Sequence, residues 1–367
     1  MPYNKFDRKK VKMLPLSERQ NKQLFAEKQI LPNAESQLSI ESAPLISEVV
    51  SKVRDAKDND KPVMLTFGAH SIKNCLAPVF IALLEGGWLS QLATNGAGII
   101  HDWEFAFQGQ TSEDVQAYAS QGKFGNWQET GFYLNLAINV GTYEGLGYGE
   151  SVGAFICNEG LEIPSKQALI EEIKQFAVSD SKKSAAAADL LIKINEFDLE
   201  EGWLSVPHPF KECSVQAAAY RLGIPFTSHP MIGHDIIYNH AMNSGACIGR
   251  AAERDFLTFA ENVRQLNGGV YLSVGSAVMS PMVFEKSMSI GRNVEIQEGR
   301  NITDHYILIV DLQESHWDWT KGEPPETNPD YYLRYNKSFS RMGGEMRYLS
   351  ADNRDFLLSL FQNLEKK

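Results

Sequence analysis

Cysteine is scarce in this sequence, and no two cysteines lie close together. The four cysteines, at positions 75, 157, 213 and 247, are far apart and form no CxxC motif. This spacing argues against structural disulfides and against a zinc site built on cysteine. It fits a reducing compartment, so we expect a cytoplasmic protein.

Long apolar runs and an excess of positive charge are also missing. No run of about 18 apolar residues is present, so we expect no membrane span. Residues 1–16 are basic but precede no apolar segment, which argues against a secretory signal. Lysine and arginine number 35 against 46 acids, a formal net charge of −11. This balance argues against nucleic acid as a partner and is compatible with a cationic substrate.

The chain instead shows a regular alternation of strand-like and helix-like segments. Buried-strand patterns at 62–68, 88–94 and 305–313 alternate with helical patterns, many of which end at glycine. A helix with a capping start is expected at 112–122. The alternation predicts an α/β fold, a doubly wound and mostly parallel sheet with helices on both faces. Residues 1–45 are interpreted as an arm that packs on the body or on a partner subunit, and 46–367 as one α/β domain with its site at the carboxyl ends of the strands.

Glycines and polar residues follow several predicted strands, where parallel sheets bind ligands. "NGAG" at 95–98 follows the second strand, and "GSAV" at 275–278 follows a later one. Glycines at such turns let backbone N–H groups approach a phosphate, and the following helix adds partial positive charge. A tight turn without a ligand would use the same residues, because this glycine pattern alone is weakly specific.

A histidine-rich segment, "SHPMIGHDIIYNH" at 228–240, invites a metal interpretation. His229, His234, Asp235 and His240 offer nitrogen and oxygen ligands, but their spacing matches no tight ligand signature. Capping by Asp235 is the simpler interpretation, and we expect no metal site.

The segment 315–332 is rich in tryptophan, tyrosine, acid and proline, and Lys337 follows it. Acids and aromatic faces can form a cradle for an aliphatic amine cation. The alternative is a solvated loop anchored by its two tryptophans. Lys337 is either a surface lysine with a buried stem or an amine kept partly desolvated for chemistry.

The order of these pieces resembles the deoxyhypusine synthase family. The resemblance covers residues 60–108 and 213–364 and is carried by "TFGAHSIKN", "TNGAGIIHD", "SHPMIGHDIIYNH", "GGVYLSVGSAV", "NPDYYLRYNKSF" and "YLSADNRDFLL". It implies a doubly wound NAD-binding fold and a homo-oligomer, a dimer or tetramer with sites at dimer interfaces. It also implies transfer of the aminobutyl group of spermidine to a lysine of the translation initiation factor five A precursor.

In that family NAD takes a hydride from the amine, and an active-site lysine carries the imine. The resemblance puts Lys337 in that role, because a lysine beside aromatic rings is more readily neutral. It implies substrate contacts from Tyr335 and Asp235, and we expect Trp317, Tyr331 and His234 to complete that pocket. The matching NAD contacts are Thr94, Asn95, Gly96, Gly98, Gly275, Ser276, Asp352 and Asn353.

Several positions depart from the family pattern. The acid of the glycine-rich loop is His101 here unless Asp102 takes its role, so both are candidate catalytic residues. The family histidine after the second glycine turn is replaced by Ser280 and Pro281, and the acid after Pro-Asp by Tyr331.

Three hypotheses follow. The first is an NAD-dependent transferase that moves an aminoalkyl group from a polyamine or small amine through a Lys337 imine. The second is a hydrolase or lyase that uses a metal or a general base among His70, His101, His229 and His234. The third is a non-catalytic NAD sensor on the same fold.

Overall fold

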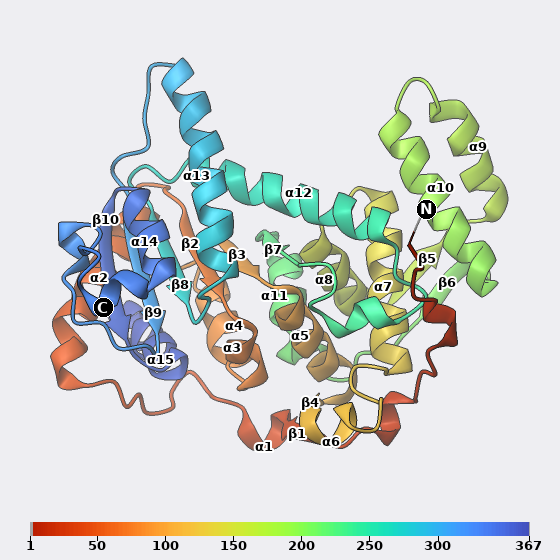
Figure 1. The fold of residues 1–367 in the computed structure, drawn as a ribbon, viewed down its shortest axis with the longest axis horizontal. Helices are drawn as coiled ribbons and strands as arrows, with labels where there is room; N and C mark the ends of the chain where they lie inside the picture. Colours follow the sequence, from red (N-terminus) through yellow and green to blue (C-terminus); the bar gives the residue numbers. More distant parts are fainter. Residues whose placement is uncertain (1–2, 367) are drawn as a thin grey trace.

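A six-stranded parallel sheet forms the centre of the computed structural model, which describes residues 3–366. Its strands are β2 (Val63–Phe67), β3 (Gln91–Thr94), β7 (Phe226–Ser228), β8 (Val270–Val274), β9 (Tyr306–Asp311) and β10 (Glu345–Ser350). Their order is β10-β9-β8-β2-β3-β7, and every neighbouring pair is parallel (Figure 1). The chain builds outward from β2 to β7, returns to β8 beside β2, and then builds in the other direction.

The described residues also form fifteen α-helices. They are α1 (Phe25–Lys28), α2 (Ala43–Asp58), α3 (Ala69–Lys73), α4 (Ala77–Glu85), α5 (Gly96–Gln108), α6 (Val115–Ala119), α7 (Gln128–Glu144), α8 (Tyr148–Asn158), α9 (Lys166–Phe176), α10 (Ser181–Phe197), α11 (Val215–Leu222), α12 (Gly245–Arg264), α13 (Met279–Gln297), α14 (Arg334–Arg341) and α15 (Asn353–Glu365). No helix within residues 3–366 combines the length and apolar character that crossing a membrane requires.

Alternate side chains of the strands feed two hydrophobic clusters, one on each face of the sheet. Val63 and Leu65 of β2 join the cluster that includes residues of α2, α4 and α15, whereas Met64 joins a second cluster. The second contains Phe284 of α13 and Phe339 of α14. Successive strand side chains point to opposite faces, so an all-apolar strand needs a helix layer on both. The predicted fold class is therefore confirmed.

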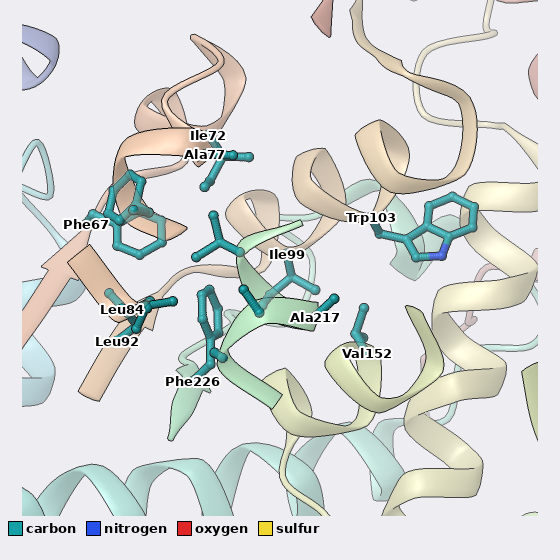
Figure 2. Close-up of a cluster of buried hydrophobic side chains, with 14 of the residues drawn as sticks. Phe67, Ile72, Ala77, Leu84, Leu92, Ile99, Trp103, Val152, Ala217 and Phe226 are labelled. Carbon is teal, nitrogen blue, oxygen red and sulfur yellow. The ribbon is translucent and has the colours of Figure 1, made fainter. Parts of the chain in front are cut away.

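The helices α7 to α10 and the antiparallel pair of β5 (Gly160–Ile163) and β6 (Gly202–Ser205) extend the molecule beyond β7. Figure 1 shows α9 and α10 at the end opposite the C-terminal helix α15. The core is continuous into this region, because Phe226 of β7, Ile99 and Trp103 of α5, and Val152 of α8 belong to one cluster (Figure 2).

The N-terminal segment is anchored on the body of the molecule. Its strand β1 (Asn21–Leu24) pairs antiparallel with β4 (Gln110–Glu113), and Leu16 and Phe25 are buried. The helix expected at 112–122 is wrong in its first part, because β4 occupies residues 110–113. Helix α6 begins only after Asp114, whose side chain caps it. The partner of β4 comes from the distant N-terminal segment, which local periodicity does not reveal.

Candidate functional site

A cavity of about 780 Å³ opens where the direction of strand addition reverses, between β2 and β8. The loops that follow β2, β3, β7 and β8 all line it, at the carboxyl edge of the sheet. Open parallel sheets bind their ligands at such a reversal point, and the volume is in the usual range for a small-molecule site. We call it the switch-point cavity.

Two glycine turns meet at this reversal point because no side chain fits between them. A Cβ on Gly68 would lie 2.0 Å from the carbonyl oxygen of Gly275. Gly275 itself has a φ of +59°, and a Cβ there would lie 2.3 Å from the side-chain nitrogen of Asn353. Gly275 and the adjacent Ser276 line the cavity. The structure thus brings three expected cofactor residues together, with Gly68 as an additional member.

The start of α5 forms another part of the wall. Asn95 caps the helix by accepting a hydrogen bond from the Gly98 N–H at 3.0 Å, and Asn95 and Gly96 line the cavity. Thr94 lies behind this turn, with its hydroxyl donating to the Phe67 carbonyl at 2.9 Å, and Gly98 packs against it. Thr94 and Gly98 therefore shape the turn from behind.

Asp235 lies directly over the first turn of α5. A Cβ on Gly96 would lie 2.2 Å from Asp235 Oδ2, so only glycine leaves room for this carboxylate. Oδ2 is sealed from solvent and has no hydrogen-bond partner among the described residues. Burial raises the pKa of Asp235 to about 7, while the nearby positive end of the α5 dipole acts in the opposite direction.

Two buried tyrosines accompany Asp235. The hydroxyls of Tyr148 and Tyr238 are sealed and lack hydrogen-bond partners in residues 3–366. Burial, and after it the charge of Asp235, raises the pKa of both phenols above its ordinary value. Polar atoms buried without partners are rare. Of these three residues only Asp235 lines the switch-point cavity.

Three histidines line the switch-point cavity, namely His70, His229 and His234. The ring of His229 lies edge-on against Phe259, and its Nε2 lies 3.1 Å from the Thr227 hydroxyl. Burial lowers the pKa of His229 to about 3, so its imidazole is neutral at neutral pH. Residues 3–366 contain no group of three or more His, Cys, Asp or Glu side chains placed to hold a metal ion.

A second cavity of about 220 Å³ lies beside the first and shares Ala97, His234 and Asp235 with it. His101 lines this smaller cavity. Burial lowers the pKa of His101 to about 4 against the opposing charge of Glu104, so this imidazole is also neutral at neutral pH.

Asp102, the other candidate catalytic residue of this helix, does not share that position. It is fully buried, lines neither of these cavities, and accepts hydrogen bonds from the start of α11. The donors are Ser214 Oγ at 2.6 Å, the Val215 N–H at 2.9 Å, the Gln216 N–H at 3.1 Å and Gln216 Nε2 at 2.9 Å. In this structure the carboxylate of Asp102 anchors α11, and a role for Asp102 on the substrate stays a prediction.

Lys337 is surrounded by rings and acid, but not at the switch-point cavity. Its Nζ lies 3.3 Å from the centre of the Tyr331 ring and 3.5 Å from Glu323 Oε1. Arg341 binds the same glutamate at 2.9 Å. The cradle of acids and aromatics expected for an amine ligand thus holds the protein's own lysine, and Lys337 is not among the described residues that line the cavity.

The loop before Lys337 is ordered by its own polar contacts. Asp330 accepts hydrogen bonds from the backbone N–H groups of His316 at 2.8 Å and Trp317 at 2.6 Å. The Trp317 indole donates to the Gly322 carbonyl at 2.8 Å. Trp317 therefore closes the loop on itself.

The remaining expected residues lie near the ends of the last two strands. The hydroxyl of Tyr335 lies 3.2 Å from that of Tyr348 on β10. Asp352 is exposed and caps α15, while Asn353 Nδ2 lies 3.2 Å from Ser71 Oγ. Among these, Asn353 reaches the glycine turns, whereas Tyr335 and Asp352 do not line the cavity.

Comparison with known proteins finds similarity in structure only. No family model matches the chain, and no curated protein matches it. Among solved structures, AgrE in complex with ornithine and NAD⁺ is 13% identical, with a TM-score of 0.43 over 90% of this chain and 34% of AgrE. A conserved candidate LOR/SDH protein from Methanococcus maripaludis S2 is 12% identical, with a TM-score of 0.41 over 91% of this chain and 70% of that one.

A candidate deoxyhypusine synthase from Entamoeba histolytica is also similar. It is 12% identical, with a TM-score of 0.36 over 86% of this chain and 85% of that one. The chain spans about a third of the length of AgrE and of ArgZ, an arginine dihydrolase from Cyanobacteria. At TM-scores below 0.5 these likenesses do not transfer an activity. The fold class rests on the strand order, which is the doubly wound order of dinucleotide-binding enzymes.

Proposed function

We propose that the protein is an NAD-dependent enzyme that oxidises an amine in the switch-point cavity and passes the aminoalkyl group onward through a lysine imine. The observation that carries this proposal is Asp235. Its sealed and unpartnered carboxylate oxygen lies at the carboxyl edge of a doubly wound sheet, directly over the start of α5. A buried carboxylate of this kind calls for a cationic or hydrogen-donating ligand.

The residues at the reversal point fit a dinucleotide. Gly68 and Gly275 keep side chains out of the space between the two turns, and the long helix α13 begins just after the second turn. Backbone N–H groups at such turns and at a helix start are suited to a pyrophosphate. When bound there, NAD would supply the acceptor for a hydride.

Asp235 would hold the amine. An ammonium group offers three donors, and the carboxylate of Asp235 offers an acceptor without a partner. With a pKa near 7, Asp235 is suited to take the proton that the ammonium must lose. The freed lone pair would then form the C=N bond while the adjacent carbon gives up a hydride, which a bound NAD⁺ would accept.

Lys337 is the proposed carrier in the second step. Its Nζ, once deprotonated, would add to the iminium carbon and the donor amine would leave. An acceptor amine would later displace Lys337, and the hydride would return to the resulting imine. The lysine is now paired with Glu323 and lies outside the switch-point cavity. The second step therefore requires Lys337 to be released from Glu323 and brought to the substrate, within one subunit or between subunits of an oligomer.

The first step is tested by incubating the protein with NAD and a panel of putrescine, spermidine and ornithine while NADH absorbance is recorded. We expect NADH to form only with an amine. Asp235→Asn keeps the shape of the side chain and should lower amine-dependent NADH formation by at least about a hundredfold, because the charge that holds the ammonium is gone. NADH binding by that variant, followed by fluorescence, should be unchanged.

The second step is tested by borohydride reduction of the same mixtures and mass spectrometry of the products. We expect an aminoalkyl adduct on Lys337 that is absent in Lys337→Ala, while Lys321→Ala, at an exposed lysine paired with Asp318, keeps the adduct. Amine-dependent NADH formation without any adduct would support an amine oxidoreductase and exclude the transferase. NAD binding without turnover would favour the sensor hypothesis, and no NAD binding would overturn the whole proposal.

A further inference from the structure

The smaller cavity has a wall of mixed character. Its apolar lining comes from Ile100, Val115, Phe124 and Ile236, and its polar lining includes His101. It meets the switch-point cavity at Asp235, so a ligand held by that carboxylate can extend from one cavity into the other. A volume of about 220 Å³ suits a short aliphatic chain.

The hydrogen bonds behind His101 begin at Arg19, which comes from the N-terminal segment. Its guanidinium binds Glu104 through two bonds of 2.8 and 2.6 Å, and both side chains are buried. Thr130 also donates to Glu104, at 2.8 Å. Burial acts to raise the pKa of Glu104, but the charge of Arg19 and these hydrogen bonds outweigh it and hold the pKa below its usual value. Glu104 is therefore ionised, and its oxygens can only accept hydrogen bonds.

This carboxylate sets the direction of the next two hydrogen bonds. Thr111 donates its single hydroxyl proton to Glu104. The Thr111 oxygen can then only accept from His101, whose Nδ1 lies 2.8 Å away. A neutral imidazole carries one N–H, so a proton on Nδ1 leaves Nε2 with a free lone pair. Nε2 has no hydrogen-bond partner among residues 3–366.

We infer that Arg19, Glu104 and Thr111 fix His101 as the tautomer protonated on Nδ1, and that its Nε2 accepts a hydrogen bond from an N–H group at the far end of the substrate. His101 is then a residue that determines specificity, and the other three position it. The inference rests on the proposed function for the identity of the near end, the amine held by Asp235. It adds that a diamine is preferred over a monoamine of the same length.

The charges around the cavity agree with a cationic far end. Arg19 and Lys73 contribute two positive charges to its lining, and Glu104, Glu113 and Asp235 contribute three carboxylates. Arg19 is already ion-paired with Glu104. A carboxylate has only acceptor lone pairs, and the lone pair of Nε2 would repel them. A ligand whose far end is a carboxylate is therefore disfavoured there.

Calorimetry on the NAD-loaded protein tests the specificity with 1,4-diaminobutane and butylamine as probes. We expect the wild type to prefer the diamine by at least about tenfold, the value of one hydrogen bond to a charged group. His101→Asn can keep the bond to Thr111 but lacks an acceptor at the Nε2 position, so it should bind the two amines about equally. His316→Asn, at an exposed histidine, should keep the preference.

Nitrogen NMR of histidine-labelled protein tests the tautomer without any ligand. The wild type should show His101 protonated on Nδ1, identified by the signal that His101→Asn lacks. Thr111→Val removes the acceptor and should release a second tautomer while lowering the diamine preference. A wild-type signal protonated on Nε2, or an undiminished preference in His101→Asn, would overturn the inference. If the wild type prefers the diamine but forms no NADH, the proposed oxidation is wrong and the recognition of the diamine by His101 stands.

Discussion

At the scale of single residues, buried polar side chains divide into two groups. Asp235 lacks a partner for one carboxylate oxygen and lines a cavity, where a ligand can supply the missing contact. His208 is different: it is buried among the rings of Trp103 and Phe155, at centre-to-centre distances of 6.1 and 4.8 Å. It lines neither of the two cavities of the candidate site. We therefore interpret His208 as a core residue whose proton uptake affects stability alone.

His208 is expected to make the protein sensitive to acid. Burial lowers the pKa of His208 to about 4 in the folded protein, below the value of 6.5 for an exposed histidine. Between these values the unfolded chain binds the proton and the folded protein does not, so stability falls as the pH falls. From pH 7.5 to 5 the loss at this residue is about 2 kcal/mol.

His208→Leu removes that titration. Urea unfolding at pH 7.5 and 5 should show a smaller loss of stability in this variant than in the wild type, by about 2 kcal/mol. His316→Leu, at an exposed position, should lose as much as the wild type. If His208→Leu is as acid-sensitive as the wild type, His208 is protonated in the folded protein and the proposed cause is wrong.

At the scale of secondary-structure elements, several polar side chains cap the starts of helices. Asn95 caps α5, Asp114 caps α6 and Asp352 caps α15 through their own side chains. The start of α11 is unusual because Asp102 reaches it from α5, across the core. One buried carboxylate thereby fixes how two helices lie relative to each other.

Asp102→Ala should destabilise the protein strongly. It leaves the Val215 and Gln216 N–H groups without an acceptor in a buried place, which costs about 3 kcal/mol or more. Asp114→Ala removes a more exposed cap and should cost clearly less. Chemical denaturation of both variants gives the comparison. Equal losses would contradict the anchoring role, and a fully stable but inactive Asp102→Ala would return Asp102 to catalysis.

At the scale of the whole molecule, the N-terminal segment belongs to the folded core. Arg19 is buried against Glu104, and the same segment pairs with β4 and contributes Leu16 and Phe25 to the large hydrophobic cluster. The smaller cavity is lined in part by Arg19, so this segment completes it. The expected arm at 1–45 is thus packed on the body of its own chain.

Arg19→Met should cost about 3–5 kcal/mol, because it leaves the Glu104 charge buried without its partner. The double variant Arg19→Met with Glu104→Gln removes both charges and should recover part of that loss. Urea midpoints of the two variants and the wild type test this. A double variant that is no more stable than Arg19→Met would show that the pair is not coupled as proposed.

The sequence by itself determined the repeating units of the fold. Apolar strands ending in glycine and helices closed by glycine are local patterns, so the parallel sheet with helices on both faces could be predicted. It also determined that residues after the strands, such as Asn95, Gly275 and Asp235, would gather at one edge, because the carboxyl ends of parallel strands face the same way.

The tertiary structure alone decided the strand order and everything that depends on it. Gly68 meets Gly275 only because β8 returns beside β2, and Asp235 lies over Gly96 only because β7 is next to β3. The sequence suggested a chemical role for Asp102 and did not show that it anchors α11, because its hydrogen-bond partners lie more than a hundred residues away. Local patterns report neighbours within a few residues, whereas contacts at such separations depend on how whole layers pack.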